Sequence, residues 1–302
     1  MTRFAAMARA VNARRSTEAG FVIFLATLIA SIAVGVTIHL TQTYHAGLAT
    51  HLAFTTLQAR AAEDHLTQNL GVIELTLRSL LESDAVDPDI ELARAVRHAP
   101  YLRSLALVNA AGQIVASSNA LNLGQMLTFD DSLPPFEVKG DALRFSRPRQ
   151  GRDFYDGRPI PVSGAEPTAQ TFFIAARDAL WRGAAYRLAA AINTDYFINH
   201  YARNVENQHG IVEVFRYDAT LVLSTDERRP LGMLDAEAAP FYAGVLPPVE
   251  FGELETARLL DWPTLAAYRA SRRYPLLVTV HIPYEYALAK WRKDRDSVLQ
   301  LV

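Results

Sequence analysis

The stretch from Gly20 to Leu40 constrains this chain most, because its 21 residues contain no charged side chain and no proline. An α-helix rises about 1.5 Å per residue, so a helix of this length spans the roughly 30 Å hydrocarbon core of a bilayer. The alternative is a cleavable signal peptide, whose apolar region is usually about 7–15 residues. The segment that follows offers only a poor cleavage site, around Tyr44 to Ala46. The sequence therefore predicts an uncleaved transmembrane helix.

The charges that flank this stretch predict its orientation. Four arginines and one acidic residue precede it, whereas the first charges after it lie far downstream and are mixed in sign. Because cytoplasmic flanks carry the excess of basic residues, we expect a cytoplasmic N-terminus and a chain that lies in the periplasm from about Thr41 onward. This makes the chain a single-pass protein of a bacterial inner membrane. The arginines are Arg3, Arg9, Arg14 and Arg15.

Composition and motifs exclude several classes of function. A net charge of −2 with a pI near 6.5 provides no basic stripe for phosphate contacts, so we expect no nucleic-acid partner. The absence of cysteine excludes disulfides, thiol catalysis and cysteine-ligated zinc. The chain has no nucleophile elbow, HExxH motif, phosphate-binding loop or cyclase signature, and its eight histidines form no pair at helical spacing within the folded part. We therefore expect no catalytic residue, no metal site and no cofactor.

A long helix is predicted to follow the membrane span and to end near Ser83. Its apolar positions have the spacing of a heptad seam with one extra residue near Leu66. The half after Leu66 is expected to pack on its own domain. The half nearer the membrane, with small Ala59 and Ala62 in the seam, is expected either to do the same or to pair with a second copy of the chain. The seam consists of Leu48, Leu52, Thr55, Ala59, Ala62, Leu66, Leu70, Ile73, Leu77 and Leu80.

Beyond residue 100 the apolar pattern changes from a helical to a strand period. Segment 103–118 predicts two strands around an Ala-Gly turn, and 141–147 predicts another strand. Segment 171–177 is expected to pair with 185–192, after which Asn193 or Thr194 caps a helix that ends near Asn204. The result is one antiparallel sheet flanked by helices.

The same order then recurs. Segment 211–224 predicts a second strand–turn–strand unit, and 264–270 with 275–282 predicts a second hairpin. Two sheets in the same order indicate a tandem of related α+β modules on one stalk. Segment 283–302 turns helical after Pro283 and carries Trp291 among basic residues, which is typical of a helix that reaches a membrane surface. We expect either that the natural protein continues beyond Val302 or that this product is truncated.

The order of these segments resembles a double-Cache domain, a tandem of PAS-like modules that bacteria use as periplasmic sensors. The resemblance is carried by YLRSLALVNAAGQIVASS, FFIAARDALWRGAAYRLAAAINTDYFINHY, GIVEVFRYDATLVLSTDERRPLG and YPLLVTVHIPYEYALAKWR, and it covers nearly everything from Thr41 to Arg295. Such domains precede diguanylate cyclases, cyclic-di-GMP phosphodiesterases, histidine kinases and chemoreceptors. The predicted regions are a cytoplasmic N-terminus (1–19), a transmembrane helix (20–40), a stalk helix (41–83), a membrane-distal module (84–205), a membrane-proximal module (206–283) and a returning helix (284–302).

The resemblance implies a ligand pocket between a sheet and its covering loops. A small amino acid, carboxylate or amine requires Arg and Tyr donors together with a carboxylate, and these gather in the distal module. We expect Arg177→Ala, or the equivalent change at Arg147 or Asp178, to abolish binding. The alternatives are that these charges are surface ion pairs, and that the protein is a membrane-tethered periplasmic binding or assembly protein without cytoplasmic output. The candidate ligand residues are Arg144, Arg147, Arg152, Asp153, Tyr155, Arg177, Asp178 and Trp181.

Overall fold

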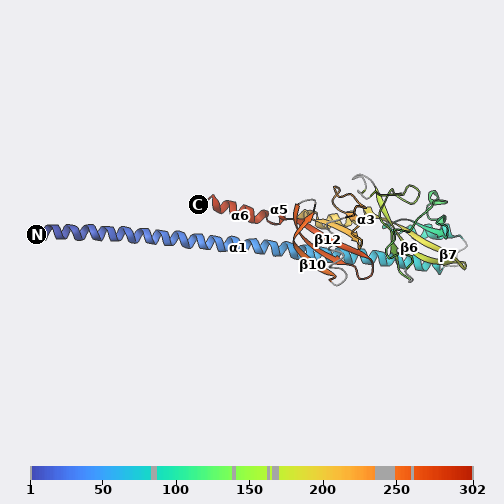
Figure 1. The fold of residues 1–302 in the computed structure, drawn as a ribbon, viewed down its shortest axis with the longest axis horizontal. Helices are drawn as coiled ribbons and strands as arrows, with labels where there is room; N and C mark the ends of the chain where they lie inside the picture. The colour runs from blue at the N-terminus through green and yellow to red at the C-terminus, as the bar shows by residue number, and fades with distance from the viewer. Residues whose placement is uncertain are drawn as a thin grey trace. The chain divides into compact units, whose positions relative to one another are not determined.

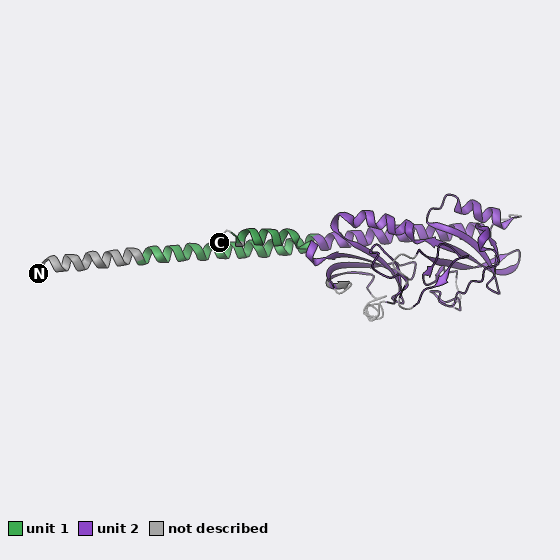
Figure 2. Cartoon of the chain, turned by 90° about the horizontal axis from the view of Figure 1, so that it is seen from above, with its two compact units in different colours: residues 1–50, 287–302 green, residues 51–286 purple. Residues whose placement is uncertain are grey.

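The computed structural model describes residues 2–82, 87–137, 141–161, 164, 170–234, 249–259 and 262–300. The chain forms two compact units (Figure 2). The first unit combines residues 1–50 with 287–302, and the second comprises residues 51–286. Helix α1 (Thr2–Leu81) contributes to both units.

The first unit contains the predicted membrane anchor. Along α1, apolar side chains such as Phe21 and Ile32 are exposed, and among the described residues one helix is long and apolar enough to cross a membrane. Helix α6 (Ala289–Leu299) lies beside α1, where the indole Nε1 of Trp291 donates a hydrogen bond to the carbonyl of Leu40 at 2.9 Å. The Trp291 ring also meets Tyr44 edge to face at 5.4 Å. The returning segment is therefore helical, as predicted, with a break at residue 288 after the short helix α5 (Tyr284–Ala287).

The second unit begins with a seven-stranded sheet in the order β2-β1-β7-β6-β4-β5, with β3 also paired to β6 (Figure 1). We call this part the distal module. The predicted pairing of 171–177 with 185–192 is confirmed, since Phe172 faces Asn193 across β6 and β7. The strands are β1 (Leu102–Asn109), β2 (Ile114–Ser117), β3 (Arg144–Phe145), β4 (Arg149–Gln150), β5 (Arg158–Pro159), β6 (Thr171–Trp181) and β7 (Ala184–Asn193).

Two helices flank this sheet. Helix α2 (Pro88–Val96) begins where the carboxylate of Asp87 accepts hydrogen bonds from the next backbone N–H groups and where Pro88 fits the first turn. Helix α3 (Thr194–Val205) starts directly after β7. Asn193 occupies the capping position, but its side chain donates to the carbonyl of Pro100 instead of capping the helix. The 3₁₀ turns η1 (Ala120–Asn122) and η2 (Glu206–Gln208) complete the connections.

A five-stranded sheet follows in the order β10-β11-β12-β8-β9, which we call the proximal module. The order β9-β8-β12-β11-β10 corresponds to β2-β1-β7-β6 of the distal sheet followed by β3 and β4, which both pair with β6. The two modules therefore repeat one topology. Strand β10 was not expected from the sequence, because Gly252 and its charged neighbours give this edge strand a weak apolar pattern. The strands are β8 (Ile211–Arg216), β9 (Leu221–Ser224), β10 (Phe251–Leu259), β11 (Trp262–Ala270) and β12 (Leu276–Pro283).

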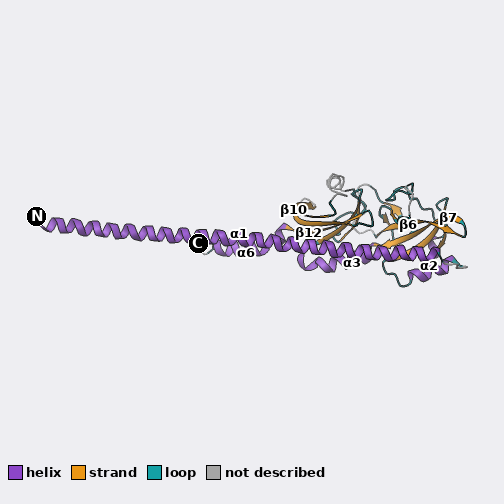
Figure 3. Ribbon diagram, turned by 90° about the horizontal axis from the view of Figure 1, so that it is seen from below, coloured by secondary structure: helices purple, strands orange, loops and turns teal. Residues whose placement is uncertain are grey.

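Helix α1 supplies the core that both sheets share. Its seam from Ala59 to Leu80 is buried in one cluster with residues of both sheets, and Figure 3 shows both sets of strands along the helix. Ala59 is 2% exposed and Ala62 is 6% exposed. The expectation that these two alanines pair with a second copy is therefore wrong, because the chain's own sheets fill this face. The predicted packing of the half after Leu66 is confirmed.

Candidate functional site

The distal sheet has two different faces because successive side chains of a strand point to opposite sides. On β6, Phe173 and Ala175 join the core on α1, whereas Phe172 and Ile174 point to the other side, which we call the loop face. The sheet presents mainly alanine side chains on the loop face, and aromatic side chains from the covering loops pack against them. These residues are Ala106, Ala176, Ala189 and Ala191 below, and Phe129, Phe136 and Phe154 above.

Two arginines enclose one phenylalanine on the loop face. The guanidinium of Arg144 lies 4.4 Å from the ring centre of Phe136, and that of Arg187 lies 4.2 Å from it. Each guanidinium is also 3.7 Å from the carboxylate of Asp178, which is directly opposite Arg187 on the neighbouring strand. Arg144 is only 1% exposed, whereas Asp178 is 61% exposed. This arrangement presents a reachable carboxylate between two cations over an aromatic surface.

Arg144 also holds the loop that crosses the sheet. Its Nη1 donates to the carbonyl of Ala142 at 3.0 Å, and its Nε donates to the carbonyl of Pro135 at 3.4 Å. Because both carbonyls flank the loop that carries Phe136, one buried side chain fixes the cover of the loop face. Movement of this loop would therefore displace Arg144.

A third cation, Arg149, lies on the same face, because it is paired with Phe172 across β4 and β6. Its Nη2 donates to the backbone and hydroxyl oxygens of Thr128 at 3.1 and 3.3 Å. Its Nε is buried and has no hydrogen-bond partner among the described residues. An unpaired buried donor costs free energy, and a ligand carboxylate would satisfy it.

Asp153 lies at the β1 end of this face, where its buried carboxylate accepts hydrogen bonds on both oxygens. It accepts hydrogen bonds from the side-chain amides of Asn119 at 2.9 Å and Asn122 at 3.2 Å, from Ser104, and from its neighbouring backbone N–H at 2.7 Å. These bonds tie the loop after β4 to β1 and η1. The neighbouring Tyr155 is 39% exposed, and its backbone N–H donates to Asn122 at 3.0 Å.

The structure divides the predicted ligand residues among several places. Arg144 and Asp178 come together on the loop face. Arg177 and Trp181 point to the α1 face, where Arg177 donates to Asp141 and has two further buried nitrogens with no partner among the described residues. Arg147 points to the proximal module. Arg152 is exposed in the loop that holds buried Asp153.

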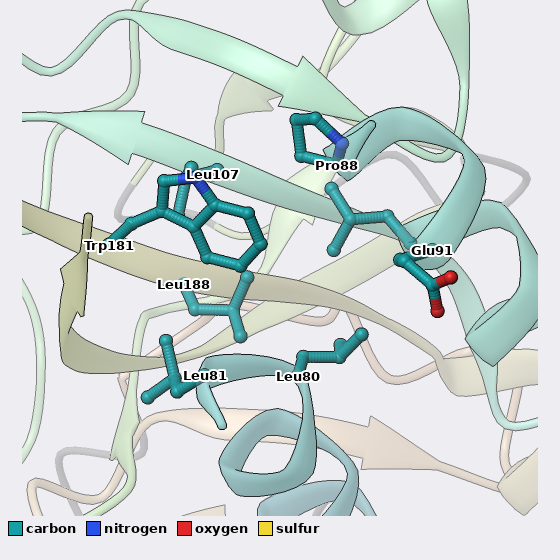
Figure 4. Close-up of a pocket in the computed structure, with 8 residues that line it drawn as sticks. Leu80, Leu81, Pro88, Glu91, Leu107, Trp181 and Leu188 are labelled. Atoms are coloured by element: carbon teal, nitrogen blue, oxygen red, sulfur yellow. The ribbon is translucent and has the colours of Figure 1, made fainter. Parts of the chain in front are cut away.

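Trp181 lines a small apolar cavity on the α1 face. Figure 4 shows Trp181, Leu107 and Leu188 on one side of this space and Pro88 and Glu91 on the other. The cavity volume is about 10 Å³, which is close to the minimum for a single water molecule. This space is too small for a metabolite, so the loop face is the better candidate in the distal module.

The distal site is joined to the proximal module through β3. Arg216, which is 2% exposed, donates from Nη1 to the carbonyl of Phe145 at 2.9 Å. The same guanidinium binds the carboxylate of Asp218 at 3.0 and 3.2 Å, and Asp218 also lies 3.4 Å from Arg147. Burial alone would raise the pKa of Asp218, but Arg216 and the donors of Thr220 hold it below its ordinary value. A permanent charge network therefore links the strand of Arg144 to the second sheet.

Arg149 and Arg187 were missed by sequence analysis, as were the phenylalanines of the cover. Nothing distinguishes Arg149 in the loop that precedes β6, because its pairing with Phe172 depends on two-residue strands. Arg187 had a usable signal, since a hairpin that pairs 171–177 with 185–192 places it opposite Asp178. Among the described residues no group of three metal-ligating side chains converges.

Comparison with known proteins places the fold. No protein-family model and no curated protein sequence matches the chain. The structure is similar to the extracellular domain of rpHK1S-Z16, which is named for a histidine kinase (TM-score 0.63, 17% identity, 81% of this chain and 99% of that one). It is also similar to methyl-accepting chemotaxis protein X (0.55, 12%, 78% and 99%). An extracellular ligand-binding receptor from Desulfohalobium retbaense matches over 76% of this chain and 40% of its own (0.54, 12%).

These likenesses confirm the architecture that the sequence predicted. The first is named as an extracellular domain and the second as a chemotaxis protein, and the alignments cover nearly the whole of both. At 12–17% identity the similarity establishes the fold. The chain therefore shares the fold of these domains, with two PAS-like modules that pack on one long helix.

Proposed function

We propose that this chain is the extracytoplasmic input domain of a membrane signalling protein and that its distal module binds a small ligand on the loop face. The arrangement of Arg144, Arg187 and Asp178 around Phe136 carries this proposal. Guanidinium groups suit a ligand carboxylate, and the exposed carboxylate suits an ammonium group. The fitting ligand class is thus a small zwitterion or carboxylate, such as an amino acid.

The proposed signal path uses the two connections of the loop face. Because Arg144 anchors the covering loop and β3 is bound to Arg216, a ligand that moves Arg144 would strain the attachment to the proximal module. The size of the response would depend on how much more tightly the ligand binds one arrangement of β3 than the other. The α1 helix and the returning α6 would then carry the change to a membrane, with the output located elsewhere.

The ligand site is tested by a thermal-shift screen of amino acids, carboxylates and amines on the full chain in detergent. A ligand that binds only the folded state stabilises it by about 2.7 kcal/mol at a hundredfold excess over Kd, which is readily measured as a shift in Tm. We expect hits to be lost in Arg187→Met and weakened in Asp178→Asn. Both side chains are partly exposed, so these changes should leave the ligand-free Tm close to wild type.

The matched control is Arg177→Met, which removes the same charge from the opposite face of the sheet. Hits that survive Arg177→Met and disappear in Arg187→Met would locate the ligand on the loop face. The reverse result would locate it on the α1 face and would overturn the site proposed here.

A further inference from the structure

A pair of stacked histidines joins α1 to α3 in the second unit. The rings of His65 on α1 and His200 on α3 have centres 3.9 Å apart and planes inclined by 10°. Tyr196 stacks more loosely on His65 at 6.0 Å. The hydroxyl of Tyr201 lies 3.5 Å from His65 Nδ1 and donates to the carbonyl of Ala62 at 3.2 Å. These contacts hold α3 against α1 through rings in which the two imidazoles are the central pair.

Among the described residues, the carboxylates nearest to this pair have other partners, so none is available to a protonated imidazole. Asp64 is paired with Arg60 at 3.8 Å, and Glu63 lies 3.5 Å from Arg269 and accepts from Thr67. At the first turn of α3, Asp195 is paired with Arg103 at 2.6 Å. Arg203, one turn beyond His200 on the same helix, adds a further positive charge. The described carboxylates of both helices are thus engaged elsewhere, and the remaining charge opposes protonation.

The titration behaviour of the cluster agrees with this geometry. Burial, and then the proximity of His200, lower the pKa of His65 to about 4. Burial, and then Arg203, also lower the pKa of His200. The neighbouring phenols stay protonated, because burial and Tyr196 raise the pKa values of Tyr201 and Tyr101.

The direction of the effect on stability follows from linkage. Above pH 6.5 both imidazoles are neutral in the folded and the unfolded chain, so they contribute no pH dependence. Between pH 6.5 and about 4 the unfolded chain binds protons that the stacked pair refuses. The α1–α3 contact therefore weakens progressively as the pH falls through this window, and the loss is complete below about pH 4.

We propose that the stacked pair of His65 and His200 is an acid-sensitive joint, which separates α3 from α1 when the medium becomes acidic. The chain passes from the distal to the proximal module through α3 and η2, so a displaced α3 changes the connection between the two sheets. A domain outside the cytoplasmic membrane experiences the pH of the medium. The joint gives the protein a response to acidity that needs no organic ligand and operates independently of the loop face.

The joint is tested on the full chain in detergent by imidazole NMR and by thermal melts between pH 7.5 and 4.5. In wild type, the resonances of His65 and His200 should titrate below pH 6.5, as should that of His51, whose pKa is also lowered by burial. His65→Phe should remove the first of these resonances and His200→Gln the second. The Tm of wild type should fall by at least about 3 °C more over this range than that of His65→Phe, which keeps a stacking ring but cannot bind a proton. The protection factors of the α3 amides, which correct for the slower intrinsic exchange in acid, should fall with pH only when both histidines are present.

His98→Gln is the matched control, because His98 is exposed in the turn after α2 and should leave the acid response unchanged. If His65→Phe folds poorly, the more peripheral His200→Gln provides the same comparison. The proposal is overturned if both imidazoles titrate at or above pH 6.5, or if the acid-induced loss of Tm and of α3 protection is the same in wild type and in the variants. None of these measurements depends on a ligand, so failure of the loop-face site would leave them interpretable.

Discussion

At the scale of single residues, the distal site combines groups with different duties. Arg187 and Asp178 are partly exposed and would contact the proposed ligand, whereas Arg144 is buried and bonded to the backbone of the loop that carries Phe136. Asp153 is a positioning residue, because the groups that donate to its carboxylate belong to its own loop, to β1 and to the η1 segment. Contact with the proposed ligand and support of the loops thus belong to different side chains.

Replacing Asp153 by Asn tests whether its hydrogen bonds hold the loop in place. Because Asn119 donates to one carboxylate oxygen and Asn122 to the other, the new amide nitrogen would face one of these two donors, which would lose this acceptor. We expect a loss of about 1–3 kcal/mol in the free energy of unfolding, measured by urea denaturation of the full chain in detergent. Asp130→Asn, at an exposed position, is the control and should change it by less than about 0.5 kcal/mol. A change of the same size in both variants would show that the buried network has no special role.

The residue scale also explains why the site was only partly predictable. Sequence analysis gathered Arg177 and Asp178 into one pocket, although neighbouring residues of a strand point to opposite faces. That alternation was available from the predicted strand and would have separated the two. The contribution of Arg149 was not available, because a two-residue strand leaves no periodic signal. Phe136 reaches the site only through the path of a loop, which local patterns do not determine.

At the scale of elements, α1 has a buried face that should not tolerate charged substitutions and an exposed face that should. The seam from Ala59 to Leu80 lies in the shared core, whereas Leu57 is 63% exposed and Leu75 is 67% exposed on the outer face. The heptad spacing predicted that α1 has a seam and where it runs. It did not reveal what covers the seam, because a domain's own sheets and a second helix demand the same apolar spacing.

Charge substitutions on α1 should therefore give contrasting results. Ala59→Glu places an unpaired carboxylate in the core, and we expect it to abolish cooperative folding as followed by circular dichroism. Leu57→Glu with Leu75→Glu should leave the Tm nearly unchanged, and in sedimentation it should reduce any self-association that uses the outer face. If Ala59→Glu folds normally and only weakens association, the assignment of the seam to the chain's own core is incorrect.

At the scale of the whole second unit, the two modules are expected to unfold together. Arg216 of the proximal sheet binds the carbonyl of Phe145 in the distal sheet, and Glu74 of α1 binds Arg273 and Tyr274 at 2.8 and 3.0 Å. Arg216→Met removes this bond between the two sheets, although the carbonyl of Phe145 keeps the N–H of Leu133 as a donor and Asp218 keeps Thr220 and Arg147. We expect calorimetry to show a lower Tm and two separable transitions in place of one. An unchanged single transition would mean that the shared α1 core alone couples the modules.

The order of contacts along α1 determines how relatives of this protein could be recombined. From Thr56 to Glu74 the helix bonds to the proximal module, through Glu253, Arg269, Ser271 and Arg273. Within this range Ala62 and His65 also contact α3. Arg78 bonds to Asp141 of the distal module, and Leu80 and Leu81 lie against Leu107 and Leu188. A chimera that exchanged the distal module would therefore have to bring the last turns of α1 with it. If the junction were placed after α1, the end of this helix would have to pack against the sheet of a different protein, for which its side chains are not complementary.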